Sequence, residues 1–222
     1  MASQQPFLTL NSGHKIPQVG YGCFMSMPNI VEKPILWAID AGCRHIDCAH
    51  IYRNEVEVGR SLKAKFDDGT VKREDMFITS KLWCDSHRLK DVRPACEESL
   101  RRLGLEYLDL YLVHLPVSFQ LIKGKQFSPL DRSVLEFEDV PLEETWKGME
   151  ELVEAGLVRS IGISNFNKAQ IDRVLASCKI PPAINQIEVS VNWMNQKLID
   201  YCHSKGIHIT AYAPFGSPGF IK

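Results

Sequence analysis

The sequence has no long apolar run. No stretch approaches the roughly 18 consecutive apolar residues that suggest a membrane span. The N-terminal segment MASQQPFLTL also lacks a basic part followed by a long apolar part, the pattern of a secretory signal. We therefore expect no membrane partner and a cytoplasmic location. The net charge of -1 likewise gives no electrostatic reason to expect a nucleic-acid partner.

The cysteine pattern contains no Cys-x-x-Cys pair, and the seven cysteines are odd in number and lie in apolar surroundings. These features favour reduced core thiols in a cytosolic protein over disulfides or a metal site. Histidine and acidic residues do not cluster as metal ligands do, so we expect no metal.

The sequence also lacks Gly-x-Gly-x-x-Gly after its first strand, which argues against the dinucleotide-binding type of open sheet. Short apolar strands alternate with amphipathic helices along the chain, which predicts a parallel sheet covered by helices. The candidate strands are Gln18–Cys23, His45–Ala49, Met76–Leu82, Leu108–His114, Val158–Ser164, Ile184–Ser190 and His208–Pro214. We interpret the pattern as a (β/α)₈ (TIM) barrel. Such a barrel needs eight strands, and seven are counted.

Two further segments complete the predicted single domain of residues 1–222. Phe7–Leu10 and Lys15–Pro17 flank Asn11-Ser12-Gly13, which predicts an N-terminal β-hairpin. Residues 116–140 are polar and fill the longest gap between strands, so we expect a loop insertion over one end of the fold.

Polar side chains occupy the ends of three consecutive predicted strands. Asp47, Lys81 and His114 lie at these ends, and Tyr52 follows Asp47 by five residues. In a (β/α)₈ barrel the C-terminal ends of the strands face the active site. Each residue could also have a purely structural role: a salt bridge for Asp47 with Lys81, a hydrogen-bonded core histidine, and a packed tyrosine. Together they favour a proton-donating site.

The chemistry of that site depends on the tyrosine. A free tyrosine titrates near ~10 and donates a proton poorly at neutral pH. A lysine ammonium beside it would lower that pKa, an aspartate would keep the lysine charged, and a histidine would orient a carbonyl oxygen. Paired carboxylates at strand ends are absent, which excludes a glycosidase-like hydrolase.

Several motifs together resemble the aldo-keto reductase family, in the branch of the aldose and aldehyde reductases and hydroxysteroid dehydrogenases. They lie in the family's order and spacing along nearly the whole chain. The motifs are Gly42–Tyr52 with Asn54-Glu55, Ile78–Trp83, Leu108–His114, Gly156–Phe166, Asn185–Glu188 and Thr210–Pro214.

The resemblance implies NADPH-dependent reduction of an aldehyde or ketone, with Tyr52 as general acid and Asp47, Lys81 and His114 as catalytic partners. Tyr52, Trp83 and His114 would contact the small-molecule carbonyl substrate, and we expect a monomer in the full-length form. The implied cofactor-binding residues are Gly22, Cys23, Phe24, Asp47, Ser164, Asn165, Gln186, Tyr212, Ala213, Pro214, Phe215, Gly216 and Ser217. Two of these could instead serve the fold alone, Tyr212 as a barrel-filling aromatic residue and Asn165 as a helix N-cap.

The chain departs from the family pattern at three places. Leu115 stands where related reductases usually carry tryptophan, and Val189–Trp193 replaces a run that resembles Cys-His-Pro-Tyr in relatives. The resemblance further implies an eighth βα unit, with a segment that grips the adenosine 2′-phosphate, and we expect this unit to be missing here. A truncated or non-enzymatic member that acts as a structural or interaction protein is therefore the alternative hypothesis.

Overall fold

The central element is a parallel sheet of seven strands in a computed structural model that describes residues 5–27, 30–122 and 132–216. In chain order the strands are β3 (Tyr21–Gly22), β4 (His45–Asp47), β5 (Phe77–Leu82), β6 (Leu110–Val113), β9 (Ile161–Ser164), β10 (Ile184–Glu188) and β11 (His208–Tyr212). Their spatial order is β11-β10-β9-β6-β5-β4-β3. All seven predicted strands are therefore present, and each is shorter than its predicted range. Among the described residues β3 and β11 each have one neighbour in the sheet.

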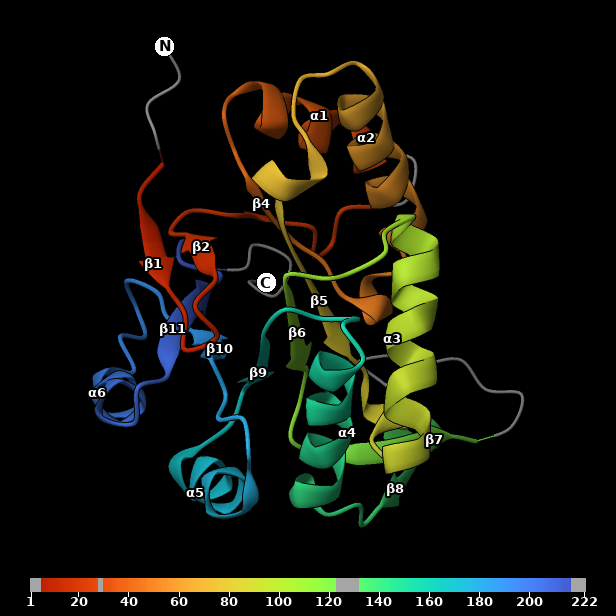
Figure 1. The fold of residues 1–222 in the computed structure, drawn as a ribbon. Coiled ribbons are helices and arrows are strands. Elements are labelled where there is room, and N and C mark those ends of the chain that lie inside the picture. The colour runs from red at the N-terminus through yellow and green to blue at the C-terminus, as the bar shows by residue number, and fades with distance from the viewer. Residues whose placement is uncertain (1–4, 28–29, 123–131, 217–222) are drawn as a thin grey trace.

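The α-helices lie around the outside of this sheet (Figure 1). They are α1 (Glu32–Asp40), α2 (Glu55–Asp67), α3 (Leu89–Leu103), α4 (Leu142–Glu154), α5 (Lys168–Ser177) and α6 (Gln196–Ser204). Each presents an apolar stripe to the sheet; in α4 the buried residues Trp146, Met149 and Leu152 form it. Gly104 and Gly156, with φ of 66° and 72°, follow α3 and α4 in the left-handed region where glycine carries no steric penalty. No described helix is long and apolar enough to cross a membrane.

The predicted N-terminal hairpin consists of β1 (Phe7–Thr9) and β2 (Lys15–Pro17). It covers the end of the sheet at which the strands begin. Asn11 Nδ2 donates to the Pro181 carbonyl at 2.9 Å, and the Ser12 and Ser160 hydroxyls lie 2.7 Å apart. Leu10 and Ile16 are buried against the first residues of the strands. The β1–β2 hairpin therefore closes the end of the sheet at which the strands begin.

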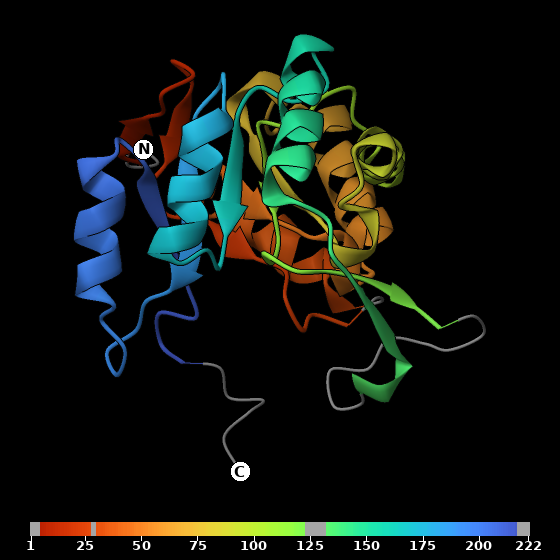
Figure 2. The same ribbon diagram turned by 90° about the horizontal axis from the view of Figure 1, so that it is seen from below.

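The prediction of a loop over residues 116–140 is wrong for the part that the structure describes. β7 (Ser118–Leu121) and β8 (Leu135–Glu138) form an antiparallel hairpin at the opposite end of the molecule from β1 and β2 (Figure 2). Residues 123–131 lie outside the described residues. The hairpin is held by Phe119, whose ring is buried and lies 5.9 Å from the Trp83 ring. Gln120 Nε2 also donates to the Asp85 carbonyl at 2.8 Å, and Glu138 pairs with Arg88, so aromatic packing and polar contacts with the segment after β5 together order the hairpin. The 3₁₀ turns are η2 (His50–Tyr52), η3 (Arg73–Asp75), η4 (Cys84–Ser86) and η5 (Arg132–Val134).

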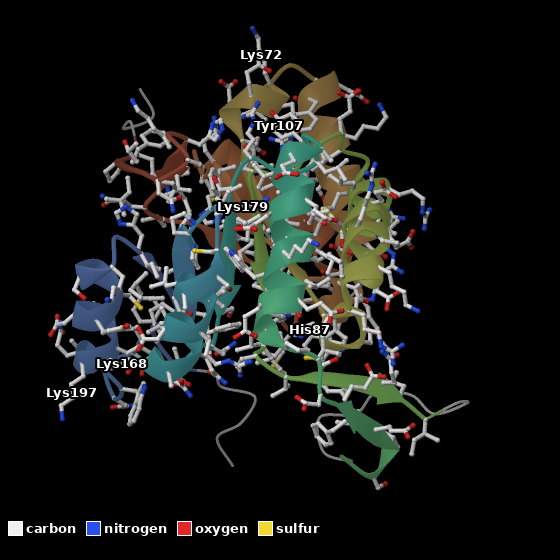
Figure 3. The ribbon with its side chains drawn as sticks, turned by 60° about the horizontal axis from the view of Figure 1, so that its bottom comes forward. Lys72, His87, Tyr107, Lys168, Lys179 and Lys197 are labelled. Carbon is white, nitrogen blue, oxygen red and sulfur yellow. The ribbon has the colours of Figure 1, made fainter. Side chains whose placement is uncertain are left out.

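A buried ion-pair network stabilises the end of the fold where the strands begin. Asp109 accepts from Arg73 at 2.7 Å and from the Ile78 backbone N–H at 2.9 Å, and Arg159 lies 3.3 Å from its other oxygen. Both guanidinium groups lie 3.9 Å from the centre of the Tyr107 ring. Tyr107 lies at the end of the molecule opposite the β7–β8 hairpin (Figure 3). The network is therefore remote from the C-terminal ends of the strands, and we assign it to stability.

We predict that Asp109→Ala lowers the free energy of unfolding by about 3–5 kcal/mol, because it leaves a mostly buried Arg73 without its carboxylate. Asp67→Ala is the matched control, since the Asp67–Lys63 pair is mostly exposed and we expect a loss of at most about 1 kcal/mol. Urea unfolding of both variants measures the difference. Equal losses in the two variants would contradict the assignment.

Candidate active site

Four predicted side chains meet at the C-terminal ends of β4, β5 and β6. Asp47 is the last residue of β4, Lys81 lies near the end of β5, and His114 directly follows β6. Tyr52 belongs to η2, the turn that follows β4. Because these strands are parallel neighbours, their ends meet at the same edge of the sheet. The structure thus brings the four residues together.

Lys81 lies at the centre of the group. Its side chain is fully buried, and its ammonium contacts Asp47 in an ion pair, the Cys48 carbonyl at 2.7 Å and the Tyr52 hydroxyl at 3.3 Å. An ammonium has three donors, so all of them are used. Burial alone would lower the pKa of Lys81, but the charge of Asp47 and, after it, the interaction with Tyr52 raise it above its ordinary value. The lysine therefore stays charged at neutral pH.

Asp47 is held from two sides. One carboxylate oxygen pairs with Lys81, and the other accepts from Gln186 Nε2 at 2.7 Å. Gln186 lies on β10, on the far side of β5, β6 and β9 in the sheet order. The side-chain contact therefore spans the interior and links strands that are not neighbours.

Tyr52 has a pKa above its ordinary value. Burial raises it most, Lys81 opposes this rise, and Asp47 adds to it. Sequence reasoning predicted a lowered pKa, which is the wrong net direction. It considered the charge of the lysine but not the loss of water around the phenol. The hydroxyl is consequently protonated at neutral pH, the form in which it can donate.

His114 is neutral. Burial, and then the charge of Lys81, lower its pKa to about 2. Its ring packs edge-on between two aromatic rings, 5.8 Å from that of Tyr52 and 5.1 Å from that of Trp83. Nδ1 is buried and has no hydrogen-bond partner among the described residues. An imidazole that stays neutral keeps one N–H donor and one acceptor nitrogen.

Four residues at the C-terminal ends of β9, β10 and β11 form one hydrogen-bonded group, which we call the rim. They are Ser164, Asn165, Gln186 and Tyr212. Ser164 Oγ donates to the Gln186 carbonyl at 2.8 Å, and Asn165 Nδ2 donates to the His114 carbonyl at 2.9 Å. The Tyr212 hydroxyl donates to Asn165 Oδ1 at 2.9 Å. These contacts connect the rim to the end of β6.

The structure contradicts one of the two structural alternatives, the role of Asn165 as a helix N-cap. Asn165 has φ of 64° and lies before α5, whose N-cap is Asn167; the Asn167 side chain accepts from the Gln170 N–H at 3.0 Å. Tyr212 is 37% exposed among the described residues, and its hydroxyl donates to Asn165 Oδ1.

The remaining predicted residues lie in two loops. Gly22 ends β3, Cys23 is fully buried, and the Phe24 ring is half exposed at 5.1 Å from the Tyr52 ring. After β11 come Ala213, Pro214, Phe215 and Gly216, of which Phe215 is 97% exposed and Gly216 has φ of 82°. Ser217 lies outside the described residues. The loop after β3 therefore contacts Tyr52 through Phe24, and the loop after β11 is exposed at Phe215.

The spacing and geometry agree with a known family of enzymes. The model of the Aldo/keto reductase family matches residues 28–222. The chain belongs to the aldo/keto reductase family. Membership confirms the family predicted from the sequence, and the strand order agrees with a (β/α)₈ barrel that contains seven of its strands in this chain.

Two curated relatives of the aldo/keto reductase chain are similar over nearly all of its length. Aldo-keto reductase family 4 member C11 of Arabidopsis thaliana is 44% identical over 99% of this chain, and family 1 member C1 of Macaca fuscata fuscata is 46% identical over 98%. The matched region is 68% of each relative.

Two solved structures of aldo-keto reductases are similar to this chain over most of its length. An aldose reductase from Schistosoma japonicum matches 94% of this chain and 69% of its own, with a TM-score of 0.88 and 48% identity. An aldo-keto reductase from Bombyx mori, solved in complex with NADP, matches 96% of this chain and 67% of its own, with a TM-score of 0.86 and 40% identity.

The sequence analysis gave no role to Asn54, which the structure places beside the Tyr52 turn. Asn54 is fully buried, and its Nδ2 donates to the carbonyls of Cys23 and Ser26, each at 3.0 Å. It therefore holds the loop after β3 against the turn that carries Tyr52. The sequence signal was available: a polar residue lies directly before α2, within the first family motif.

We predict that replacing His114 by Gln makes stability less sensitive to acid. An unfolded histidine takes up a proton as the pH falls through about 6.5, whereas folded His114 stays neutral. The unfolded state then binds more protons, so stability that is present above this pH is lost as the pH falls.

Thermal melting between about pH 7 and pH 5 measures the effect. His45 and His87 are also buried with lowered pKa values, so we expect a residual slope in the variant. Equal slopes in the parent and in His114→Gln would show that His114 takes up a proton in the folded chain.

Proposed function

We propose that the chain catalyses NADPH-dependent reduction of an aldehyde or ketone to an alcohol, with Tyr52 as proton donor. The observation that carries this proposal is the Lys81 ammonium, which is buried, paired with Asp47 and 3.3 Å from the Tyr52 hydroxyl. No side chain can supply a hydride, and the bound nicotinamide cofactor would provide it.

Tyr52 donates the proton. Negative charge develops on the carbonyl oxygen as the carbonyl carbon is reduced, and the phenol transfers its proton to that oxygen. The phenolate that remains faces Lys81, which is already fixed and charged. Stabilisation of this product-side charge by a preorganised cation lowers the barrier without any rearrangement of solvent.

His114 places the substrate. Because its imidazole is neutral, it can donate an N–H hydrogen bond to the carbonyl oxygen without competing as a stronger acid. The rings of Tyr52 and Trp83 flank it and form an apolar wall beside the reacting group. The substrate class is therefore a small carbonyl compound held between an apolar wall and two donors.

The rim is suited to a nicotinamide. Its carboxamide needs both donors and acceptors, and Ser164, Asn165 and Gln186 offer hydroxyl and amide groups next to Asp47. The Tyr212 ring is partly exposed, which leaves a face for stacking. Gly22, Cys23 and Phe24 on one loop and Ala213–Gly216 on the other would contact the ribose and pyrophosphate. The choice of NADPH rests on family membership, and the reduced-thiol pattern of the cysteines supports a cytoplasmic location.

We predict that Tyr52→Phe lowers kcat by about 10²–10⁴-fold, the usual contribution of a general acid, and leaves NADPH affinity unchanged. Loss of NADPH absorbance with an aldehyde substrate measures turnover, and fluorescence of the bound nucleotide measures affinity.

Tyr201→Phe is the matched control, because its hydroxyl contacts Asp172 between α6 and α5, far from the site. Full turnover in Tyr52→Phe would assign the proton to another group. Equal losses in the two variants would indicate a general effect on folding.

A further inference from the structure

The segment that carries Tyr52 is a single 3₁₀ turn. Two backbone hydrogen bonds close it, from the Tyr52 N–H to the Ala49 carbonyl at 3.0 Å and from the Arg53 N–H to the His50 carbonyl at 3.1 Å. Arg53 has φ of 56°, so the chain reverses directly after the tyrosine. A turn this short has little stability of its own, and outside contacts must fix its position.

One outside contact comes from α3. Arg102 Nη1 lies 3.1 Å from His50 Nδ1. A guanidinium can only donate, so His50 Nδ1 must be the acceptor. This bond attaches the first residue of the turn to the helix that packs beside α2 (Figure 1).

Arg102 is itself fixed by two carboxylates. Its Nε donates to Glu98 Oε1 at 2.7 Å, and its Nη1 lies 3.9 Å from Glu55 Oε2. The side chain of Glu55 is 1% exposed and accepts from the Ser80 and Ser99 hydroxyls. A carboxylate this deeply buried needs a cation, and among the described residues Arg102 is the cation in its ion pair.

The same network also contacts the strand that carries Lys81. Ser80 precedes Lys81 on β5, and Glu55 begins α2 three residues after Tyr52. Arg102 is thus connected to the turn of Tyr52 through His50 and to the strand of Lys81 through Glu55 and Ser80. None of these contacts touches the site where substrate would lie.

We propose that Arg102 is a positioning residue, which acts through His50 to hold Tyr52 at its distance from Lys81. This inference rests on the proposed function of Tyr52 as proton donor. Reaction rates are sensitive to small displacements of a reacting group, so a loosened turn lowers turnover.

The helix offers a closely matched control. Arg101 is the preceding residue and pairs with the same Glu98, but its side chain is 71% exposed and its two hydrogen bonds both go to that carboxylate rather than to the turn. Arg102→Ala removes the bond to His50, whereas Arg101→Ala leaves it in place. His50→Leu removes the same bond from the other side and keeps Arg102 paired with Glu98 and Glu55. His50→Gln retains an acceptor for the guanidinium.

Hydrogen exchange followed by mass spectrometry measures the turn directly, in peptides that contain the amides of Tyr52 and Arg53. We expect exchange to be at least about tenfold faster in Arg102→Ala and in His50→Leu, the effect of losing one charge-assisted hydrogen bond. The double variant should exchange no faster than Arg102→Ala, and Arg101→Ala and His50→Gln should match the parent. In turnover assays kcat should fall about three- to tenfold in Arg102→Ala and His50→Leu, with an unchanged KM for NADPH.

Unchanged exchange in His50→Leu, or equally fast exchange in Arg101→Ala, would overturn the proposal. If Arg102→Ala fails to fold, the two His50 variants still decide it. A parent chain without reductase activity would refute the proposed function, while the exchange comparison would still show whether Arg102 fixes the turn.

Discussion

The ion pair between Lys81 and Asp47 is the interaction on which the site depends. It places the Lys81 ammonium in the interior, where water cannot solvate it, so the folded chain itself must supply its partners. That requirement explains why Lys81 and Asp47 each make several hydrogen bonds. Asp47 is held by Gln186 from β10, and the third donor of Lys81 fixes the Cys48 carbonyl at the entrance to the Tyr52 turn. Removal of either charge would leave the other buried and unpaired.

Burial and charge act against each other throughout the site, and the outcome differs from residue to residue. For Lys81 the neighbouring charges outweigh burial, so the ammonium persists and its pKa stays high. For Tyr52 burial outweighs the lysine, so the phenol keeps its proton. For His114 burial and the lysine act in the same direction, and the imidazole is neutral. The resulting arrangement is a protonated donor beside a fixed cation and a neutral hydrogen-bonding group, as carbonyl reduction requires.

The sequence predicted those features that depend on periodicity and on strand ends. Seven strands, the N-terminal hairpin and the meeting of Asp47, Lys81 and His114 follow from local patterns and from parallel topology. The β7–β8 hairpin did not, because the buried Phe119 ring and polar contacts with the segment after β5 order it, and these contacts join residues far apart in the sequence. The direction of the Tyr52 pKa shift depends on how much water is excluded, which no pattern encodes. The Arg102–His50 contact joins residues 52 positions apart, one on a helix and one in a turn, and the sequence offers no signal for it.

Titration of Tyr52 by NMR, with tyrosine labelled at the ring carbon that bears the hydroxyl, in the parent chain and in Lys81→Met, tests directly whether Lys81 controls the tyrosine. A Tyr52→Phe sample assigns the resonance. We expect that the Tyr52 pKa lies above the ordinary tyrosine value of about 10 and rises further in Lys81→Met, because the cation that opposes burial is gone. The same pKa in both proteins, or a lower one in the variant, would contradict the claim that the buried lysine governs the acidity of Tyr52.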